Sequence, residues 1–362
     1  MASATPEPTF AAPDPGKLDA LVGRMFGDIG ACVSGALVLL GDHLGLYKAM
    51  ARLGPATSAE IAAATGTKER YVREWLSAQA ASDYVEYDKF TGKFSVSAEQ
   101  ATVFANEDSP AFMGGAFEVA ASLWRDEPKV GAAFKSGKGV GWHEHDACLF
   151  CGTERFFRPG YNANLVSAWI PALDGVEGKL QAGAKVADVG CGHGASTILM
   201  AKAYPRSTFT GFDYHEGSIE RAKAAAAEAG VSDRIDFQVA AAASYPGKDY
   251  DLVCIFDALH DMGDPVGAAR HIRATLKPDG AWMLVEPFAH DDLADNLNPV
   301  GRVFYSASTM ICTPASLSQE VGLGLGAQAG EGRLRAVTEE AGFKRFRRAT
   351  ETPFNLVLEV RP

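Results

Sequence analysis

A buried strand that runs into a glycine-rich turn is the feature that most limits how this chain can fold. Residues 185–189 are apolar enough to form a buried parallel strand, and the turn Gly190-Cys-Gly192-His-Gly194 opens a helix over residues 195–203. A second apolar strand, residues 207–212, leads directly into Asp213. Glycines let the backbone approach a ligand closely, and an acid at a strand end can accept hydrogen bonds from both hydroxyls of a ribose. The segment therefore predicts a binding site for a cofactor that contains a nucleoside.

The glycine spacing alone does not identify that cofactor. Gly190, Gly192 and Ala195 also satisfy the dinucleotide-binding pattern G-x-G-x-x-G/A. A doubly wound sheet whose glycines serve only tight packing is a further alternative. The sequence around the turn distinguishes these alternatives, and its first informative residue is Asp188, the acid that precedes the turn.

Several segments downstream of the turn follow one another in a characteristic order. They are the apolar residues 250–256, Leu276-Lys-Pro-Asp-Gly280, the segment 282–287 and Ala341-Gly-Phe343. As a set they resemble the class I S-adenosylmethionine (SAM) methyltransferases over residues 155–362. That resemblance implies an α/β fold with a Rossmann-like, seven-stranded sheet.

The resemblance also assigns residues to the cofactor site. It places the backbone amides of Gly190 to Gly192 beneath the methionine part of SAM and the ribose hydroxyls on Asp213. Tyr214 is expected to stack beside the adenine, although an aromatic that merely flanks a helix is an equally good interpretation. Asp188 and Asp257 complete the cofactor-binding set on this view.

One position departs from the family pattern. Related methyltransferases carry an acid after the third strand that accepts a hydrogen bond from the adenine amino group, whereas this chain has Ala241 there. Losing a hydrogen bond to a charged acceptor costs about 1.5–3 kcal/mol, roughly ten- to hundred-fold in affinity. A backbone contact at Ala242 would survive. The substitution therefore leaves open weak binding of SAM, a water in place of the carboxylate, or a reaction other than methylation.

The catalytic candidates follow the fourth strand, in Asp257-Ala-Leu-His260-Asp261. Strand ends in such sheets point into the ligand crevice, and a neutral imidazole there can take the proton from a phenol, enol or acidic N–H. The segment resembles small-molecule O-methyltransferases of the plant type, whose base is the histidine of this motif. The same resemblance makes Glu286 the residue that orients His260, with a second flanking acid near Glu331. The alternative is a histidine at a helix start that bonds only backbone.

A second cluster of polar residues precedes the sheet. His143, His145, Cys148 and Cys151 lie within ten residues, and imidazoles and thiolates are the usual ligands of zinc. A structural zinc site normally needs a second, distant pair of ligands, so we expect pocket lining or loop packing and no metal. Cys191 and His193, in the glycine turn, are expected to be buried neighbours of the cofactor. Cys312 could face a substrate.

The N-terminal part predicts a winged helix-turn-helix. Helical periodicity over residues 17–50, a capping box from Thr57 to Glu60, a helix over 68–81 and a hairpin over 84–96 give the order helix, helix, helix, hairpin. Such a unit can bind DNA, but seven Lys/Arg against eight Asp/Glu over residues 34–100 argue against it. On the third helix Tyr71, Val72, Trp75 and Leu76 resemble a packing stripe. In small-molecule O-methyltransferases this unit serves dimerisation, which is our preferred interpretation.

The expected domains are a disordered tail (1–16), the winged-helix dimerisation domain (17–100), a helical linker and pocket segment (101–165) and the methyltransferase domain (166–362). Strands and helices alternate in the last domain, which indicates a mostly parallel sheet. Its last two strands are too close for a crossover helix and should pair antiparallel. Residues 288–331 interrupt the alternation, and a loop of that length typically forms a lid or specificity element.

Composition limits the remaining choices. At 362 residues the chain is long enough for two domains, and no run of ~18 apolar residues indicates a membrane span. The first residues lack the basic and apolar regions of a signal peptide. Six scattered cysteines suggest reduced thiols in a cytoplasm. A net charge of −11 argues against a nucleic-acid partner.

The resemblance extends over nearly the whole chain to a bacterial group of winged-helix SAM methyltransferases, through segments 70–76, 154–160 and 256–265. It implies the two-domain architecture and a homodimer and does not supply a substrate. Taken together, the observations predict a cytoplasmic enzyme that transfers a methyl group from SAM to oxygen or nitrogen of a small molecule, with His260 as the base. Two alternatives stay open. One is a transcription regulator that senses a nucleoside ligand, and the other is a methyltransferase fold with different chemistry.

Overall fold

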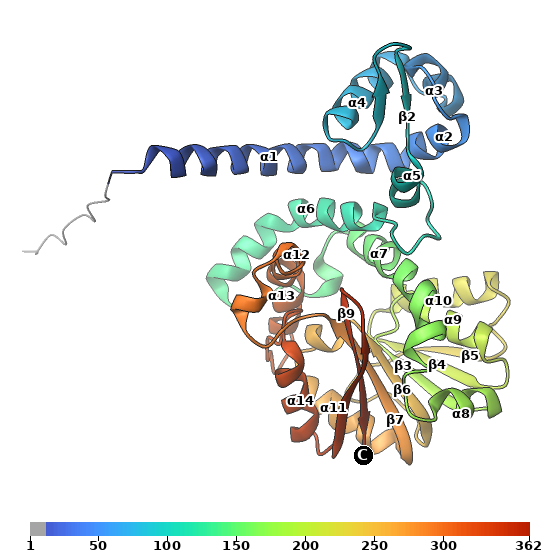
Figure 1. The fold of residues 1–362 in the computed structure, drawn as a ribbon. Helices are drawn as coiled ribbons and strands as arrows, with labels where there is room; N and C mark the ends of the chain where they lie inside the picture. The colour runs from blue at the N-terminus through green and yellow to red at the C-terminus, as the bar shows by residue number, and fades with distance from the viewer. Residues whose placement is uncertain (1–11) are drawn as a thin grey trace, which may run out of the picture. The chain divides into compact units, whose positions relative to one another are not determined.

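The computed structural model describes residues 12–362, and the chain divides into two compact units, Met1–Asn106 and Glu107–Pro362 (Figure 1). Residues 1–11, most of the expected N-terminal tail, lie outside the described residues. The remainder of that expected tail includes the start of the first helix at Pro15, where Asp14 caps the helix by accepting a hydrogen bond from the amide of Lys17 at 3.0 Å. The boundary between the units falls six residues beyond the one expected at 100, and residues 107–165 belong to the unit that contains the large sheet.

The first unit has the order of a winged helix. Its elements are α1 (Pro15–His43), α2 (Leu46–Leu53), α3 (Ser58–Thr65), α4 (Glu69–Ala81), β1 (Glu86–Asp88), β2 (Lys93–Ser95) and α5 (Ala98–Phe104). The long helix expected over residues 17–50 is interrupted at Gly45, whose φ of 67° only glycine adopts at low cost. The capping box between Thr57 and Glu60 forms as predicted, with reciprocal hydrogen bonds.

Helix α4 packs with one face and exposes the other. Val72, Trp75 and Leu76 are buried, and the Trp75 Nε1–H donates to the carbonyl of Leu37 on α1 at 2.8 Å. Tyr71 is 80% exposed, so including it in the packing stripe was wrong. At about 100° per residue, Val72, Trp75 and Leu76 span roughly 100° of the helix surface, and Tyr71 lies about 90° from the centre of that arc, outside the buried face.

Helix α1 is apolar yet largely uncovered within this unit. Exposed apolar side chains follow its length, and they are Leu18, Leu21, Val22, Met25, Phe26, Ile29, Val33 and Leu40. In the part of the chain that the structure describes, α1 is also the one helix long and apolar enough to cross a membrane, judged by length and composition alone. From the sequence we expected no segment long and apolar enough to span a membrane, and α1 departs from that expectation.

The second unit is a layered α/β structure. Before the sheet come α6 (Gly114–Ser136), η1 (Trp142–Glu144), α7 (Cys148–Asn164), η2 (Leu165–Trp169) and α8 (Val176–Ala182). The sheet region contains β3 (Lys185–Val189), α9 (Ala195–Ala203), β4 (Thr208–Asp213), α10 (Glu216–Glu228), β5 (Ile235–Val239), β6 (Tyr250–Phe256), η3 (Leu259–Asp261), α11 (Pro265–Thr275) and β7 (Leu276–Pro287). The chain ends with α14 (Gly330–Glu340), β8 (Arg345–Glu351) and β9 (Asn355–Arg361).

The seven strands form one sheet in the order β5-β4-β3-β6-β7-β9-β8. Strands β3 to β7 run parallel to one another, while β9 runs antiparallel to both β7 and β8, as the short connection predicted for the last two strands. Successive residues alternate between two apolar clusters, so that Val186 packs with α8, α9 and α10 and Ala187 packs with α11 and α14. Figure 1 shows these helices on opposite faces of the sheet. The predicted Rossmann-like, seven-stranded fold is confirmed.

The segment 288–331 is not a plain loop. It contains η4 (Leu293–Asn296), α12 (Pro299–Ala307), η5 (Ser308–Cys312) and α13 (Thr313–Leu317). Asn298 caps α12 by accepting a hydrogen bond from the Gly301 amide, and Pro299 at the first helical position fits this start.

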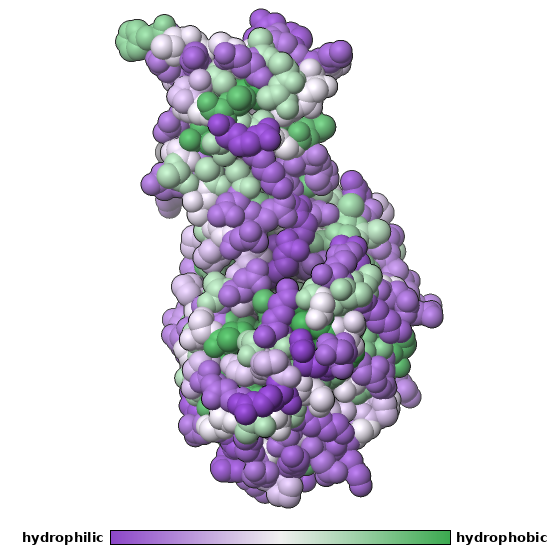
Figure 2. All heavy atoms as spheres, turned by 90° about the vertical axis from the view of Figure 1, so that its right-hand side faces the viewer, coloured by the Kyte–Doolittle hydropathy of each residue, from purple (hydrophilic) through white to green (hydrophobic). Residues whose placement is uncertain are grey.

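The outer face of the second unit that Figure 2 shows is mostly hydrophilic, with hydrophobic side chains in small groups.

Candidate active site

The glycine turn after β3 is held against the end of β4. The amides of Gly190 and Cys191 both donate to the carbonyl of Phe212, at 2.7 and 3.0 Å. Gly190 and Gly192 have φ values of 76° and 52°, in the left-handed region that favours glycine. The turn thereby brings bare backbone to the carboxyl ends of two neighbouring strands.

Asp213 ends β4 beside this turn. Its Oδ2 accepts from the amide of Gly192 at 3.0 Å and its Oδ1 from the amide of His215 at 2.9 Å. Burial raises the pKa of Asp213, and the two amide donors oppose that rise. Each oxygen keeps a second lone pair, so the carboxylate can still accept hydrogen bonds from a ligand.

Asp188 lies behind the turn instead of facing the cavity. It is 1% exposed, and its Oδ2 accepts from the hydroxyls of Ser196 and Thr197 at 2.7 and 2.6 Å. Burial raises the pKa of Asp188 to about 6. This acid therefore ties the end of β3 to the start of α9, and it does not line the cavity into which the other predicted cofactor residues face.

A cavity of about 500 Å³ opens at this edge of the sheet, within the usual size range of small-molecule sites. Its wall contains most of the predicted cofactor residues, namely Gly190, Gly192, Asp213, Tyr214, Ala241, Ala242 and Asp257. The opposite wall comes from the segment before the sheet and is rich in aromatic groups, namely Trp142, His143, Phe150, Phe157 and Tyr161. At Ala241 the wall has a methyl group where the family pattern has a carboxylate.

Asp257 takes an unusual backbone conformation at the end of β6. Its φ is 49°, and its carboxylate accepts from the Tyr161 hydroxyl and from the side-chain amide of Asn355, each at 3.0 Å. Burial, and secondarily the nearby Glu286, raises the pKa of Asp257 to about 8. The carboxyl group is thus fixed in place by α7 and β9 together.

His260 and Glu286 form a buried pair, as the sequence predicted. The His260 Nδ1 lies 2.5 Å from Glu286 Oε2, and the Glu286 Oε1 accepts from the amide of Leu259 at 2.9 Å. Both side chains are almost fully buried. Burial alone would lower the pKa of His260, but Glu286 and Asp261 outweigh it and raise that pKa well above 6.5.

The other side of the imidazole faces Asp261 and Cys312 instead of the expected second glutamate. Asp261 Oδ1 lies 3.3 Å from His260 Nε2, and the Trp142 Nε1–H donates to Asp261 Oδ2 at 2.8 Å. Asp261 lines the cavity, whereas His260 does not. Glu331 pairs with Arg335 and Arg348 at 2.9 and 2.7 Å, so the loose alignment that placed it beside the histidine was wrong.

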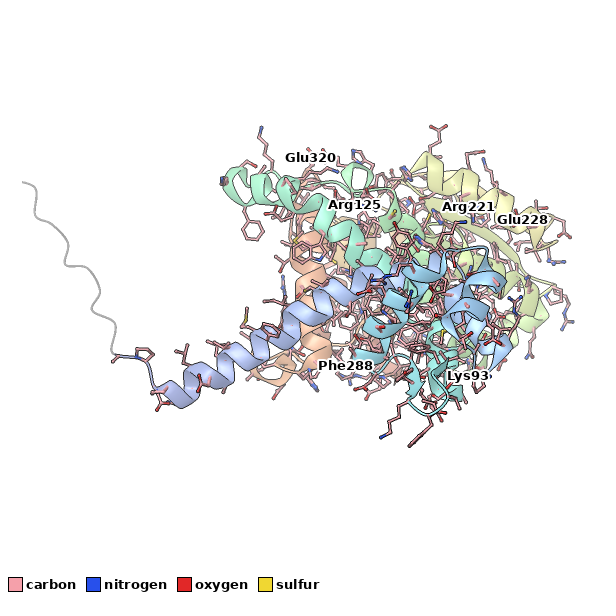
Figure 3. The ribbon with its side chains drawn as sticks, turned by 90° about the horizontal axis from the view of Figure 1, so that it is seen from above. Lys93, Arg125, Arg221, Glu228, Phe288 and Glu320 are labelled. Carbon is pink, nitrogen blue, oxygen red and sulfur yellow. The ribbon has the colours of Figure 1, made fainter. Side chains whose placement is uncertain are left out.

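The histidines and cysteines of residues 143–151 do not converge on one point. His143 lines the cavity, while His145 is buried with its Nδ1 2.9 Å from Asp126. Cys148 accepts from Arg125, which projects from α6 (Figure 3), and Cys151 is exposed. This segment therefore forms part of the cavity wall and of its support.

Several contacts in the site could not be predicted from the sequence. The sequence offers no local pattern that pairs Tyr161 or Asn355 with Asp257, or Trp142 with Asp261. His193, expected as an inert neighbour, contacts Glu154 through Nδ1 at 2.9 Å, and this hydrogen bond lowers the pKa of Glu154. Only the long-range fold brings these pairs together.

Two family models match this chain, one in each unit. Residues 180–335 match a family described as "Methyltransferase domain", and residues 32–106 match a "Rv2258c-like winged HTH domain". The chain therefore combines a methyltransferase domain with an N-terminal winged helix-turn-helix domain.

Curated relatives match part of the chain. The 27-O-demethylrifamycin SV methyltransferase of Amycolatopsis mediterranei is 36% identical over 107 residues, 29% of this chain and 39% of that protein. The acetylserotonin O-methyltransferase of Mus musculus is 30% identical over 183 residues, 49% of this chain and 43% of that protein. The chain thus covers less than half the length of either relative.

Solved structures share the fold over nearly the whole chain. Human N-acetylserotonin methyltransferase in complex with SAM has a TM-score of 0.69 at 17% identity, covering 98% of this chain and 99% of that one. The mitomycin 7-O-methyltransferase also has a TM-score of 0.69, at 20% identity, covering 96% of this chain and all of that one.

Proposed function

We propose that this chain is a SAM-dependent methyltransferase that methylates an oxygen, or a nitrogen, of a small molecule. One observation carries the proposal. A single cavity joins the glycine turn and Asp213 at one end to Asp261, beside the His260–Glu286 pair, at the other. A nucleoside-binding end and an acid–base pair are what methyl transfer to a weakly acidic group requires.

The residues of the cavity fit SAM except at the adenine. Asp213 retains lone pairs for two ribose hydroxyls, and Tyr214, Ala241 and Ala242 provide an apolar wall for the adenine. Asp257 would hold the methionine ammonium, whose positive charge would favour the ionised carboxylate over the neutral form that burial favours. When bound, SAM supplies a methyl group activated by its sulfonium. The missing carboxylate at Ala241 predicts weaker binding than the family pattern and no loss of the site.

The acid–base pair would remove the acceptor's proton. The Glu286 carboxylate holds the proton on Nδ1 and fixes the plane of the ring, which leaves Nε2 as the atom that accepts a proton from the acceptor. In the present arrangement Asp261 and Trp142 lie between Nε2 and the open cavity. We propose that the acceptor replaces the Trp142–Asp261 hydrogen bond as it binds, so that water stays excluded from the pair.

The first test is titration of the purified chain with SAM and S-adenosylhomocysteine by calorimetry, in parallel with the Ala241→Asp variant. Micromolar binding by the unaltered chain supports the cofactor, and an acceptor screen that follows formation of S-adenosylhomocysteine comes next. Binding only by Ala241→Asp would mean that the fold is retained without the activity. Absence of binding by both proteins would refute the methyltransferase proposal.

We further propose a homodimer formed through the first unit. The exposed apolar side chains along α1 are a surface that an isolated soluble chain does not retain at low cost. DNA binding is less favoured, because the arginines of α4 are already paired along the helix, Arg70 with Glu74 and Arg73 with Glu69. Phe26→Asp is expected to shift the mass measured by light scattering toward a monomer. An unchanged dimer would place the interface elsewhere.

Chemistry other than methylation is the second candidate, and Ala241 is the observation that favours it. If SAM binds and yet no acceptor in a broad phenol, enol and amine screen is methylated, chemistry other than methylation becomes the preferred candidate.

A cytoplasmic location is also part of the proposal, supported by six free cysteines.

A further inference from the structure

Three potential metal ligands meet at the buried end of the site. His260, Asp261 and Cys312 each offer one donor atom, and these atoms all lie within 4.8 Å of one another. Among residues 12–362 they form the one group of three such side chains that gathers in this way. His260 and Asp261 lie on η3, whereas Cys312 ends η5, so the group is assembled by the fold and not by a local motif.

One oxygen in this group lacks a hydrogen-bond partner. Asp261 Oδ1 is buried and accepts no hydrogen bond, although it lies 3.3 Å from His260 Nε2. The other oxygen of the same carboxylate is held by Trp142 at 2.8 Å, which aims Oδ1 toward the imidazole. When protonated, His260 Nε2 already supplies a positive charge 3.3 Å from this oxygen, and a metal ion that replaces that proton would bind both atoms and satisfy the buried carboxylate.

The imidazole is already arranged as in many metal-binding histidines. Such a residue binds the ion through one ring nitrogen and donates the other N–H to a carboxylate. Here Glu286 takes Nδ1, so Nε2 points toward Asp261 and Cys312. The Cys312 thiol is 6% exposed, and Glu286 adds a further negative charge beside the group.

We propose that His260, Asp261 and Cys312 form a binding site for a divalent transition-metal ion of the zinc class. A mixed set of nitrogen, oxygen and sulfur donors suits Zn²⁺. Asp261 Oδ1, His260 and Cys312 are all buried, so the ion would lie behind the cavity wall that Asp261 and Trp142 form. Binding would release the thiol proton of Cys312, and any proton on His260 Nε2, to solvent. The ion would then hold the electron pair of Nε2 and so suspend proton transfer by the pair, a consequence that rests on the proposed function.

The geometry requires a small contraction. Bond lengths of about 2.0–2.3 Å around a tetrahedral zinc place neighbouring donors roughly 3.3–3.8 Å apart. His260 Nε2 and Asp261 Oδ1 already stand at 3.3 Å, and the widest pair is within 4.8 Å. A closure of about one ångström at Cys312 would complete the site, and η5 is a π-helical turn, a type of backbone often found at functional sites.

The test is metal binding by the full chain after treatment with a chelator. Zn²⁺ alone is titrated by calorimetry, and Co²⁺ alone is followed by absorption, because a cobalt–thiolate bond gives a charge-transfer band. We expect one ion per chain and a thiolate band that disappears in both Cys312→Ser and Cys312→Ala. Glu286→Gln should weaken binding by about ten- to hundred-fold through its hydrogen bond to the ligand histidine.

A matched control removes the competing thiols. The variant with Cys148→Ser and Cys151→Ser should bind as the unaltered chain does, because these residues lie in a different segment. A band that survives Cys312→Ser or disappears in the control would overturn the site, as would the lack of any stoichiometric binding. These outcomes are measured as metal binding and need no catalytic turnover, so failure of the metal site can be distinguished from failure of the proposed methyl transfer. Zn²⁺ inhibition, measured for each variant relative to its own metal-free rate, then tests the effect on the base.

Discussion

The two ends of the cavity are built by different means. The turn end, formed by Gly190–Gly194 and Asp213, is fixed by backbone amides within the consecutive elements β3, α9 and β4 and at the turn that follows β4. The pair end, formed by His260, Glu286 and Asp261, depends on side chains from four separate segments, including Trp142 and Cys312. A ligand site made of backbone amides needs only consecutive elements of the chain and tolerates changes of side chain. A site made of buried side chains depends on segments that the whole fold brings together. Substitutions at the two ends should therefore change different quantities.

The largest effect is expected at the pair end. His260→Ala removes the proposed base and should lower kcat by about 10²- to 10⁴-fold with little change in SAM affinity. Steady-state rates and calorimetry on the same preparation separate the two quantities. His290→Ala, at an exposed histidine of the same unit, is the control. A loss of less than about tenfold would remove His260 from the role of base.

The pH profile should also report on the pair end. A base acts only when deprotonated, and Glu286 and Asp261 raise the pKa of His260 well above 6.5. The rate should therefore increase by about tenfold per pH unit on the acid side of that pKa. Glu286→Gln removes one cause of the rise, so its profile should shift to lower pH. A profile that is unchanged in this variant would assign the titration to another group.

At the turn end, Asp213→Asn should weaken SAM binding by about ten- to hundred-fold, because a charged acceptor of ribose hydroxyls is lost. The rate at saturating SAM should change far less than in His260→Ala. Asp236→Asn on the neighbouring strand β5 serves as the control. Equal losses in both variants would indicate a general effect of charge and would contradict direct binding.

The smallest effect is expected for Ala241→Asp. A hydrogen bond from the adenine to a charged acceptor is worth at most about 1.5–3 kcal/mol, and an introduced side chain that gives up hydration and rotamer freedom should retain only a few-fold to roughly tenfold of it in SAM affinity. Calorimetry at matched salt measures the gain, with Ala241→Asn as a neutral comparison. If affinity for SAM falls, the adenine does not lie at this wall.

The contrast also explains what the sequence could predict. The sheet, its antiparallel last strands and the glycine turn followed from periodicity and short-range spacing, because backbone preferences act over a few residues. The partnership of His260 and Glu286 came from resemblance to a known family. Glu331 was misplaced because it was positioned by counting back from Ala341, and its arginine partners on α14 and β8 became visible only in the fold. The Trp142–Asp261 and Asn355–Asp257 contacts join residues about one hundred positions apart, beyond the reach of any local pattern.

Asp257 also constrains how relatives of this chain can vary. Within the described residues, the three non-glycine positions with positive φ are Asp83, Asp249 and Asp257, and all three are aspartates. Aspartate, asparagine and glycine tolerate that backbone, whereas β-branched residues do not. Position 257 is therefore open to very few replacements even before ligand contacts are considered. A library randomised at this codon should return folded protein mainly with these three residues, and divergence of substrate preference among relatives would have to arise elsewhere along the wall.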